Sequence, residues 1–209
     1  MSRLVIFDAD GTLFDTRAIT ILNLRRTAEA MGFKTSSDEE MTAVLSKATS
    51  RGIADGLGLG PEEGETAIRT FFSISLSNPD DLSGPYPGIP ELVADLRSEG
   101  YATAIASLKA QPLLDRLVAS ADMEFDSVRG VTGRSDTKAD LIRRCLEDLN
   151  AAPGDAVMVG DTENDMAAAG EVGIPFIPVT YGFGFTPDDR GASDAGGIGR
   201  RIRDILRIV

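Results

Sequence analysis

Short, almost entirely apolar segments constrain the fold of this chain more than any other feature. They span residues 4–7, 102–106, 156–159 and 176–179, and the last three each follow a helix-like segment. Continuous apolar runs of this length are typical of strands buried on both faces, as in a parallel sheet. Because such strands alternate with helices here, the sequence predicts an α/β fold with a doubly wound, Rossmann-like parallel sheet.

Helical periodicity fills the stretches between these runs. Around residues 89–96, 114–121 and 141–149, apolar side chains recur at steps of three and four, which is the spacing of one helix face. Ligands of open parallel sheets bind outside the carboxyl ends of the strands. The first candidates for a functional site are therefore the residues that follow the apolar runs, namely Asp8, Ser107 and Asp161.

A different pattern occupies residues 17–82, where helical spacing continues without a strand-like run. The second of its helices begins at the capping pair Ser37 and Glu40, and the third begins near Pro61. Turn-forming residues from 77 to 88 mark the return to the sheet. The domains expected from this pattern are an inserted helical cap at residues 17–82 and an α/β core formed by residues 1–16 and 83–209.

Composition excludes several classes of function. The formal net charge is −12, from 21 basic and 33 acidic residues, so a surface for nucleic acid or for anionic membranes is not expected. The chain contains no histidine, which leaves carboxylates, lysines and hydroxyls to carry chemistry. The single cysteine, Cys145, excludes an intramolecular disulfide and a multi-cysteine metal site. No apolar run reaches the roughly 18 residues of a membrane helix, and the first residues do not resemble a signal peptide, so we expect a cytoplasmic location.

Acidic residues gather after two of the apolar runs. Asp8 and Asp10 stand two residues apart directly after the first run, and Asp161 and Asp165 stand four residues apart after the third. Clustered carboxylates repel one another unless a cation lies between them, and hard oxygen ligands suit Mg²⁺, which also binds phosphate oxygens. Gly11 permits a tight turn with close approach of the backbone. The sequence therefore predicts a magnesium site at the carboxyl edge of the sheet.

Residues 8–16, Asp-Ala-Asp-Gly-Thr-Leu-Phe-Asp-Thr, resemble the first motif of the haloacid dehalogenase superfamily, in the form usual among its phosphatases. The resemblance implies that Asp8 is the nucleophile that takes the phosphoryl group, and that Asp10 protonates the leaving alcohol and then activates water. The segment around Asp161 and Asp165 is similar to the fourth motif, which supplies the other metal carboxylates. Asp165 either binds the ion directly, binds it through water, or stands in the first turn of a helix. The Mg²⁺ ligands implied in this way are Asp8, Asp10, Asp161 and Asp165.

Ser107 and Lys138 are similar to the second and third motifs of the superfamily. The resemblance implies that the Ser107 hydroxyl binds the transferring phosphoryl group, and that Lys138 pairs with the nucleophile and the phosphoryl oxygens. Many relatives have asparagine where this chain has Leu108, and they usually have proline where it has Ala139. Lys109 is the alternative to Lys138 for the role of the lysine. The substrate- and phosphate-binding residues expected on this basis are Gly11, Thr12, Ser107, Leu108, Lys138 and Arg51.

The cap is expected to close over the site, to exclude water during phosphoryl transfer and to contact the substrate. Its candidate contact loop spans residues 46–52, in which Arg51 or Lys47 binds a carboxylate or a second phosphate, or belongs to a solvated basic cluster. The order of the motifs, with a helical insertion directly after the first, resembles the phosphoglycolate phosphatase-like and β-phosphoglucomutase-like branch of the superfamily.

These features predict a Mg²⁺-dependent hydrolase of small phosphate monoesters that works through an aspartyl-phosphate. Its partner would be a small phosphorylated metabolite, and it would act as a monomer or homodimer. A phospho-accepting signalling module, similar to a response-regulator receiver, would need neither the proton donor Asp10 nor a long cap. Phosphomutases of the superfamily typically keep a histidine near the start of the insertion, which this chain lacks. A catalytically silent relative used for binding is supported only by the departures at Leu108 and Ala139.

Overall fold

A parallel sheet forms the centre of the computed structural model, which describes residues 3–34, 37, 59–78, 82–133, 136–186 and 195–206. Within this part of the chain the strands are β1 (Leu4–Phe7), β2 (Ala102–Ala110), β3 (Ser127–Val131), β4 (Ala156–Gly160) and β5 (Phe176–Pro178). Their order across the sheet is β3-β2-β1-β4-β5, and every neighbouring pair is parallel. The expected parallel sheet is therefore confirmed.

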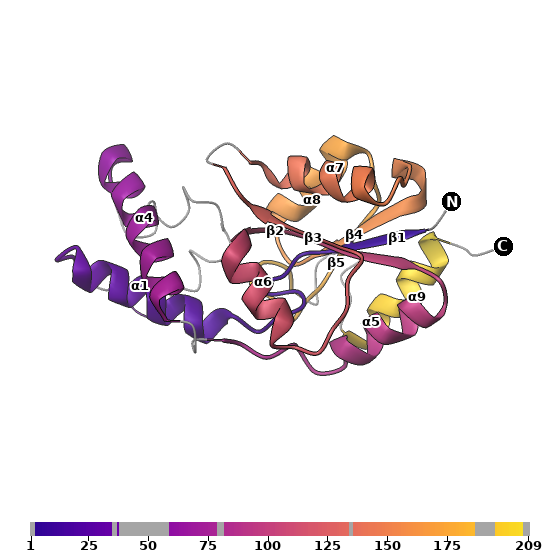
Figure 1. Ribbon diagram of the computed structural model, residues 1–209, viewed down its shortest axis with the longest axis horizontal. Helices are drawn as coiled ribbons and strands as arrows, with labels where there is room; N and C mark the ends of the chain where they lie inside the picture. The colour runs from indigo at the N-terminus through magenta and orange to yellow at the C-terminus, as the bar shows by residue number, and fades with distance from the viewer. Residues whose placement is uncertain are drawn as a thin grey trace.

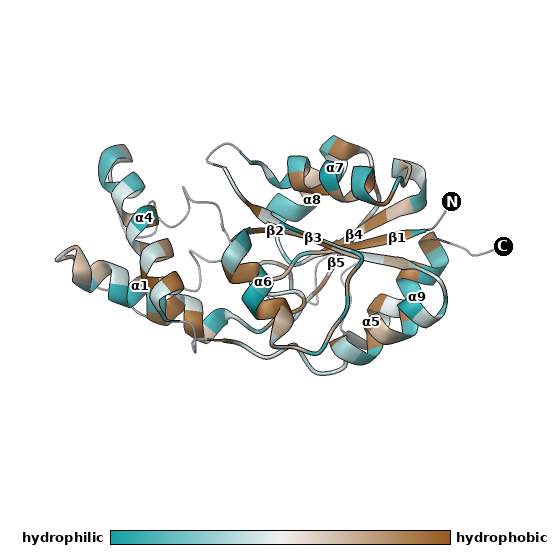
Figure 2. Cartoon of the chain, in the orientation of Figure 1, coloured by the Kyte–Doolittle hydropathy of each residue, from teal (hydrophilic) through white to brown (hydrophobic). Residues whose placement is uncertain are grey.

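The central strand β1 is apolar at every position because it is covered on both faces. Successive side chains of a strand point to opposite sides. Val5 and Phe7 accordingly join one core cluster, whereas Leu4 and Ile6 join the other, and all of them are fully buried. In Figure 2 the strands form an apolar layer between helices that carry hydrophilic residues on their outer surfaces.

Helices cover both faces of the sheet (Figure 1). The face of Val5 and Phe7 packs against α5 (Ile89–Ser98), α6 (Gln111–Ala119) and α9 (Ala195–Ile205). The face of Leu4 and Ile6 packs against α7 (Lys138–Asp148) and α8 (Glu163–Val172), and a short 3-10 helix, Pro153–Asp155, precedes β4. In the part of the chain that the structure describes, no helix has the length and apolar composition needed to cross a membrane.

The chain order reverses at β1. From β1 the chain continues to β2 and β3 on one side of the sheet, and it then crosses to β4 and β5 on the other side. Open parallel sheets bind ligands at such a reversal, outside the carboxyl ends of the strands. β1 and β4 are neighbours with Phe7 opposite Val159, so Asp8 and Asp161 leave adjacent strand ends.

Two helices of the insertion, α1 (Arg17–Ala30) and α4 (Pro61–Ser77), pack against each other outside the layers that cover the sheet (Figure 1). Leu24 of α1 and Phe71 of α4 belong to the same small apolar cluster. The expected helical insertion after the first motif is therefore present. The second predicted helix, which would begin at Ser37 and Glu40, lies almost entirely outside the described residues, so the exact limits of the cap stay a prediction.

Some elements differ from the sequence pattern. β2 continues to Ala110 instead of ending at residue 106, so Ser107 lies within the strand, at a point where the pairing with β3 changes register. The pattern does not predict β3, because its sequence, Ser-Val-Arg-Gly-Val, is short and not continuously apolar. The pattern also leaves out α9, although Ile198 and Ile202, four residues apart, are fully buried against the sheet.

Candidate active site

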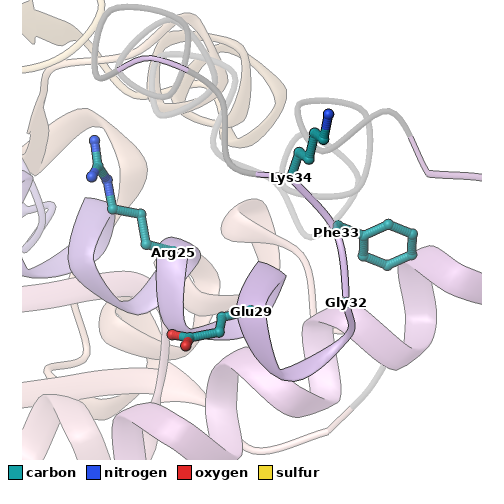
Figure 3. A pocket seen from close by; sticks show the side chains of 5 residues that line it. All are labelled: Arg25, Glu29, Gly32, Phe33 and Lys34. Atoms are coloured by element: carbon teal, nitrogen blue, oxygen red, sulfur yellow. The ribbon is translucent and has the colours of Figure 1, made fainter.

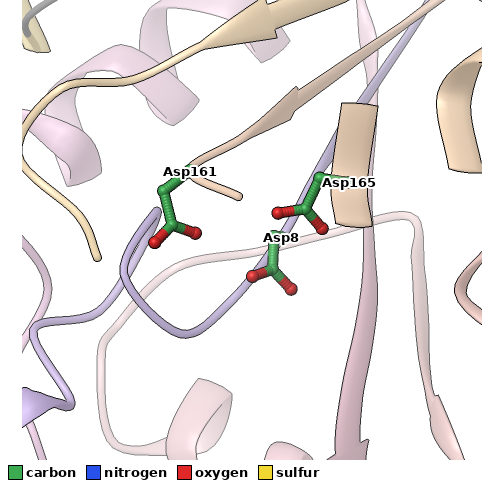
Figure 4. A group of neighbouring side chains, drawn as sticks. All are labelled: Asp8, Asp161 and Asp165. Carbon is green, nitrogen blue, oxygen red and sulfur yellow. The ribbon is translucent and has the colours of Figure 1, made fainter. Parts of the chain in front are cut away.

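Buried carboxylates meet at the carboxyl ends of β1 and β4. Asp8 follows β1, Asp161 follows β4, and Asp165 lies in the first turn of α8. One oxygen atom of each carboxylate lies within 4.8 Å of the corresponding atoms of the others. Figure 4 shows the three side chains gathered from these separate segments. The structure thus brings together three of the four acidic residues that the sequence predicts as metal ligands.

The environment of Asp8 opposes its negative charge. The pKa of Asp8 is raised to about 7: burial is the largest cause, the positive charge of Lys138 partly offsets it, and the negative charges of Asp165 and Asp10 add to the rise. The backbone N–H of Asp8 donates to the carbonyl oxygen of Val159 at 2.9 Å, which holds the residue against β4. Asp8 therefore needs more positive charge nearby to be fully ionised at neutral pH.

Lys138 supplies part of that charge. It is the first residue of α7, and its ammonium nitrogen lies 2.5 Å from Asp8 Oδ1 and 2.8 Å from Asp165 Oδ1. The side chain is only 4% exposed. Burial lowers the pKa of Lys138, but the charges of Asp165 and Asp8 outweigh burial and raise it above its ordinary value. Lys138, rather than Lys109, is thus the lysine that contacts Asp8.

Asp165 has two structural tasks at once. It is the third residue of α8, and its Oδ2 atom accepts hydrogen bonds from the Thr162 backbone N–H at 3.1 Å and from the Thr162 hydroxyl at 2.6 Å. Its Oδ1 atom contacts Lys138. Asp165 therefore stands in the first turn of a helix, as one of the alternatives proposed from the sequence. Its carboxylate also lies in the acidic cluster. Asp165 therefore connects the start of α8 to Lys138 and to the acidic cluster.

Asp161 is the most enclosed member of the cluster. Its residue surface is fully buried. Burial raises its pKa well above the ordinary value, with the charges of Asp8 and Asp165 adding to the rise. Its Oδ1 atom accepts from the Thr12 hydroxyl at 3.1 Å, and its Oδ2 atom accepts from the backbone N–H of Phe183 at 2.8 Å. Thr12, expected at the phosphate, thus contacts Asp161.

A loop after β5 is the part of the site that the sequence interpretation misses. Residues 181–185, Tyr-Gly-Phe-Gly-Phe, pass directly over Asp161. A Cβ atom on Gly182 would lie 2.4 Å from Asp161 Cβ and 2.4 Å from the carbonyl oxygen of Gly11, so no side chain fits there. The available signal is the pair of glycines that alternate with aromatic residues just after a strand end.

Asp10 and Ser107 both contact Lys109. Asp10 Oδ1 is 3.0 Å from the ammonium nitrogen of Lys109, and the Asp10 side chain is 27% exposed. Ser107 is buried, and its Oγ atom accepts from the backbone N–H of Lys109 at 3.2 Å. The Asp10 carboxylate is not in the described cluster of three, so its role as a metal ligand stays a prediction.

Of the remaining residues considered from the sequence, Gly11 lies beside Asp161, whereas Leu108 and Ala139 belong to the core. Gly11 has a φ of +80°, and a Cβ atom there would lie 2.3 Å from Asp161 Oδ2, so the motif needs glycine at this turn. Leu108 packs with the core cluster beneath α7 and α8, and Ala139 is buried in that cluster. Arg51 and Lys47 lie outside the described residues.

The donor set fits a divalent cation. Three buried carboxylates and one ammonium group give a charge of −2 when all are ionised, because three negative charges face a single positive one. Carboxylate oxygens are the ligands that Mg²⁺ prefers. Burial, together with the charges of neighbouring carboxylates, raises the pKa values of Asp8 and Asp161, and a bound cation would favour their ionised forms. Asp8, Asp161 and Asp165 are the described residues whose carboxylate oxygens lie close enough together to hold Mg²⁺ here.

An open hollow of 650 Å³ lies elsewhere, near the end of α1. Arg25, Glu29, Gly32, Phe33 and Lys34 line it (Figure 3). Its described lining contains no member of the acidic cluster, and residues 38–58, which follow in the chain, lie outside the described residues. The hollow is therefore separate from the candidate active site.

Comparison with protein families gives the class of the protein. The family model for haloacid dehalogenase-like hydrolases matches residues 5–179. This range includes all of the sheet except Leu4, the first residue of β1, and every member of the acidic cluster. The chain therefore belongs to the haloacid dehalogenase-like hydrolases, and the resemblance inferred from its motifs is confirmed.

The chain is similar to individual proteins with different names. The tyrosine-protein kinase PtkA of Mycobacterium tuberculosis is 30% identical over 187 residues, which cover 87% of this chain and 63% of PtkA. The chain thus spans less than two thirds of that relative's length. The phosphoglycolate phosphatase of Agrobacterium fabrum is 30% identical over 199 residues, which cover 90% of this chain and 84% of that enzyme. The crystal structure of a predicted phosphatase from Clostridium acetobutylicum matches with a TM-score of 0.86 and 23% identity, over 98% of this chain and 99% of that one, which supports the fold.

Proposed function

We propose that this protein is a Mg²⁺-dependent phosphatase that hydrolyses a small phosphate monoester through an aspartyl-phosphate on Asp8. The observation that carries the proposal is the contact of Lys138 with Asp8 beside the buried carboxylates of Asp161 and Asp165. A nucleophilic carboxylate, a buried cation to hold it, and ligands for a metal ion are thereby present in one place.

The first chemical step follows from the position of Asp8. Its free carboxylate oxygen attacks phosphorus, a bond forms between that oxygen and phosphorus, and the bond from phosphorus to the alcohol oxygen breaks. Asp10 gives its proton to the departing alcohol oxygen. Lys138 holds Asp8 Oδ1 and thereby orients the attacking oxygen. The Ser107 hydroxyl donates to a phosphoryl oxygen, and neutralisation of the phosphoryl charge is the chemistry that Mg²⁺ supplies when bound.

The second step regenerates the enzyme. Asp10, now ionised, takes a proton from water, and the resulting oxygen attacks phosphorus. The bond between phosphorus and Asp8 then breaks, which releases inorganic phosphate. In this proposal residues 17–82 act as the cap, and α1 and α4 restrict water at the site during transfer.

The comparisons support hydrolysis and leave one further candidate. The phosphatase of A. fabrum matches this chain over 84% of its length, whereas PtkA does so over 63%. The similarity to a protein named as a tyrosine kinase is nevertheless equally high in identity. The second candidate function is therefore transfer of the phosphoryl group from Asp8 to a tyrosine hydroxyl instead of to water.

A screen of small phosphate monoesters tests the proposal. We expect phosphate release that requires Mg²⁺ and stops when EDTA is added. Asp8→Asn should lower turnover by at least about 1,000-fold, because the amide cannot form the acyl-phosphate. The matched control is Asp204→Asn, which changes an exposed carboxylate on α9 and should retain turnover.

Two results would contradict the proposal. Turnover that persists in a folded Asp8→Asn variant would show that Asp8 is not the nucleophile. Phosphate that reaches tyrosine peptides faster than water, in the presence of a phosphate donor, would favour the kinase candidate over the phosphatase.

A further inference from the structure

Phe183 links the acidic cluster to the helical insertion. Its backbone N–H donates to Asp161 Oδ2 at 2.8 Å, and the backbone N–H of Phe185 donates to the Asp161 carbonyl oxygen at 3.2 Å. The loop of residues 181–185 therefore contacts Asp161 on both its side chain and its main chain. Any movement of this loop changes the hydrogen bonding of Asp161.

The side chain of Phe183 packs against residues of the other domain. It lies in the apolar cluster around the buried residue Leu24 of α1, together with Ile21 of α1 and Phe71 of α4. These helices lie outside the layers of the core in Figure 1. One residue thus has its backbone at the cluster of Asp8, Asp161 and Asp165 and its ring in the insertion.

Arg17, the first residue of α1, strengthens the same link. Its guanidinium carbon lies 5.1 Å from the centre of the Phe183 ring, and its Nη2 atom donates to the carbonyl oxygen of Gly182 at 2.7 Å. A cation over an aromatic face is attractive, and a hydrogen bond from a charged donor is strong. Both contacts tie the loop to the start of the insertion.

The flanking glycines make the ring important for the position of the loop. Glycine restricts the backbone less than any other residue, and glycines stand on either side of Phe183 at positions 182 and 184. Of these three residues, Phe183 has the only side chain that can anchor the loop by packing. The contacts that the ring makes with Leu24 and Arg17 of α1 therefore help to place the N–H that donates to Asp161, and Phe71 of α4 packs against the same Leu24.

From this geometry we infer that Phe183 is a positioning residue, through which the packing of α1 and α4 sets the orientation of the Asp161 carboxylate and hence the affinity for Mg²⁺. The inference rests on the proposed function in that Asp161 must hold the ion. Groups that orient a metal ligand commonly change metal affinity about 10- to 100-fold when they are removed. Phe183 and its neighbours in the insertion should have effects in this range.

Titration of the metal-free protein with Mg²⁺, followed by calorimetry, tests the inference. We expect Phe183→Ala to weaken Mg²⁺ binding by about 10-fold, and Phe183→Leu to restore most of the affinity because an apolar anchor remains. Phe71→Ala should weaken binding in the same direction, although this residue belongs to α4. The control is Leu76→Ala, because Leu76 is an exposed apolar residue of α4 that is not part of the Phe183 cluster.

Arg17→Ala keeps the test decisive if a core variant fails to fold, because Arg17 is partly exposed and both of its contacts with the loop are lost. It should weaken Mg²⁺ binding several-fold while the far-ultraviolet circular dichroism stays unchanged. A residue with a purely structural role would lower the melting temperature without changing the Mg²⁺ affinity. Wild-type affinity in folded Arg17→Ala and Phe71→Ala would overturn the inference.

Asp161→Asn separates this inference from the proposed function. Loss of Mg²⁺ binding in Asp161→Asn, with wild-type binding in the Phe183, Phe71 and Arg17 variants, would leave the proposed function intact and reject the inference. Unchanged Mg²⁺ binding in Asp161→Asn would reject both, because the ion would then be held elsewhere. Loss in Asp161→Asn together with weakened binding in the other variants supports both.

Discussion

Asp8 and Asp10 stand two residues apart, yet they have different neighbours. Asp8 lies at the end of β1, is buried and pairs with Lys138, whereas Asp10 is partly exposed and pairs with Lys109. A buried carboxylate held by a fixed cation is suited to nucleophilic attack. A carboxylate nearer to solvent is suited to exchanging protons. The two positions of the motif are therefore chemically distinct before any substrate binds.

Removal of the proton donor should affect esters according to their leaving group. We predict that Asp10→Asn lowers turnover of alkyl phosphates by about 100- to 10,000-fold, because an alkoxide leaves poorly without a proton. The loss in phosphorylation of the enzyme should be much smaller for nitrophenyl phosphate, whose anion leaves readily. Rapid-quench measurement of the first step with both substrates checks this. Equal losses for both would contradict the assigned role.

The backbone at Gly182 lies so close to Asp161 and Gly11 that even the methyl group of an alanine should disturb the loop. Gly182→Ala places a Cβ atom 2.4 Å from both Asp161 Cβ and the Gly11 carbonyl oxygen, so the loop must move. We predict a loss of about 1 to 3 kcal/mol in unfolding free energy, together with weaker Mg²⁺ binding. Gly154→Ala meets no atom within 4 Å and serves as the control. Urea unfolding and calorimetry provide the measurements, and an unchanged Mg²⁺ affinity in Gly182→Ala would show that the loop does not constrain Asp161.

At the level of elements, α7 and α8 begin in the same way but serve the site differently. Thr137 caps α7 in a reciprocal pair with Asp140, and Thr162 caps α8 in a reciprocal pair with Asp165. Both caps satisfy backbone N–H groups that a helix start leaves free. Only the second pair includes a member of the acidic cluster. The start of α8 is therefore both a helix cap and a support for the metal site.

Alanine substitutions at Thr137 and Thr162 should separate the contribution to helix capping from the contribution to metal binding. We predict that Thr137→Ala and Thr162→Ala each lower the unfolding free energy by about 1 kcal/mol, which is typical for the loss of a threonine cap. Thr162→Ala should also weaken Mg²⁺ binding, because Asp165 loses the hydroxyl that contacts its Oδ2 atom at 2.6 Å. Denaturant unfolding and Mg²⁺ titration of both variants check this. The idea is wrong if both variants bind Mg²⁺ equally well.

The packing of α7 on the sheet explains the position of Lys138 beside Asp8 and Asp165. The helix packs on β1, β2 and β3 through a continuous apolar face that includes Leu141, Ile142 and Cys145. This face fixes the first residue of the helix above the end of β1. The lysine side chain then reaches Asp8 and Asp165 while remaining buried. The position of the Lys138 ammonium group is therefore set by the packing of α7 against the sheet.

For the whole molecule, the acidic cluster makes stability depend on pH and on the metal. The pKa of Asp8 rises from 3.8 to about 7, and the pKa of Asp161 also rises, both mainly through burial. Between those values the folded protein binds more protons than the unfolded chain. The unfolding free energy of the metal-free protein must therefore fall as pH increases from about 4 to about 7.

We predict that the metal-free protein melts at a lower temperature at pH 8 than at pH 5.5, by a shift on the order of 5 °C. Mg²⁺ should stabilise it more at pH 8, because protons compete with the ion at lower pH. The pKa values of Asp136 and Asp148 are lowered by hydrogen bonds with Arg144 and Arg129, so their contributions are lost only at more acidic pH. Calorimetric melting with and without Mg²⁺ gives the measurement. Asp8→Asn is the control and should show a smaller pH dependence.

Local patterns in the amino-acid sequence are sufficient to predict the class of the fold and the types of residue in the candidate site. Continuous apolar runs such as 4–7 predict buried parallel strands, and the motifs beginning at Asp8 and around Asp161 place carboxylates at neighbouring strand ends. These properties depend on residue type and on local spacing, which the sequence states directly. The helical insertion follows from the same local periodicity.

Which groups contact one another depends on how the helices and strands pack. Lys138 and Lys109 are chemically equivalent in the sequence, and the packing of α7 on the sheet places the first on Asp8 and leaves the second on Asp10. The edge strand β3 forms by pairing with β2, although its own residues carry only a weak pattern. Phe183 contacts Asp161 through a backbone N–H that nearly every residue possesses, so residue type gives no signal for it. Contacts between distant segments depend on how packed elements are placed in space, and local sequence patterns do not contain that information.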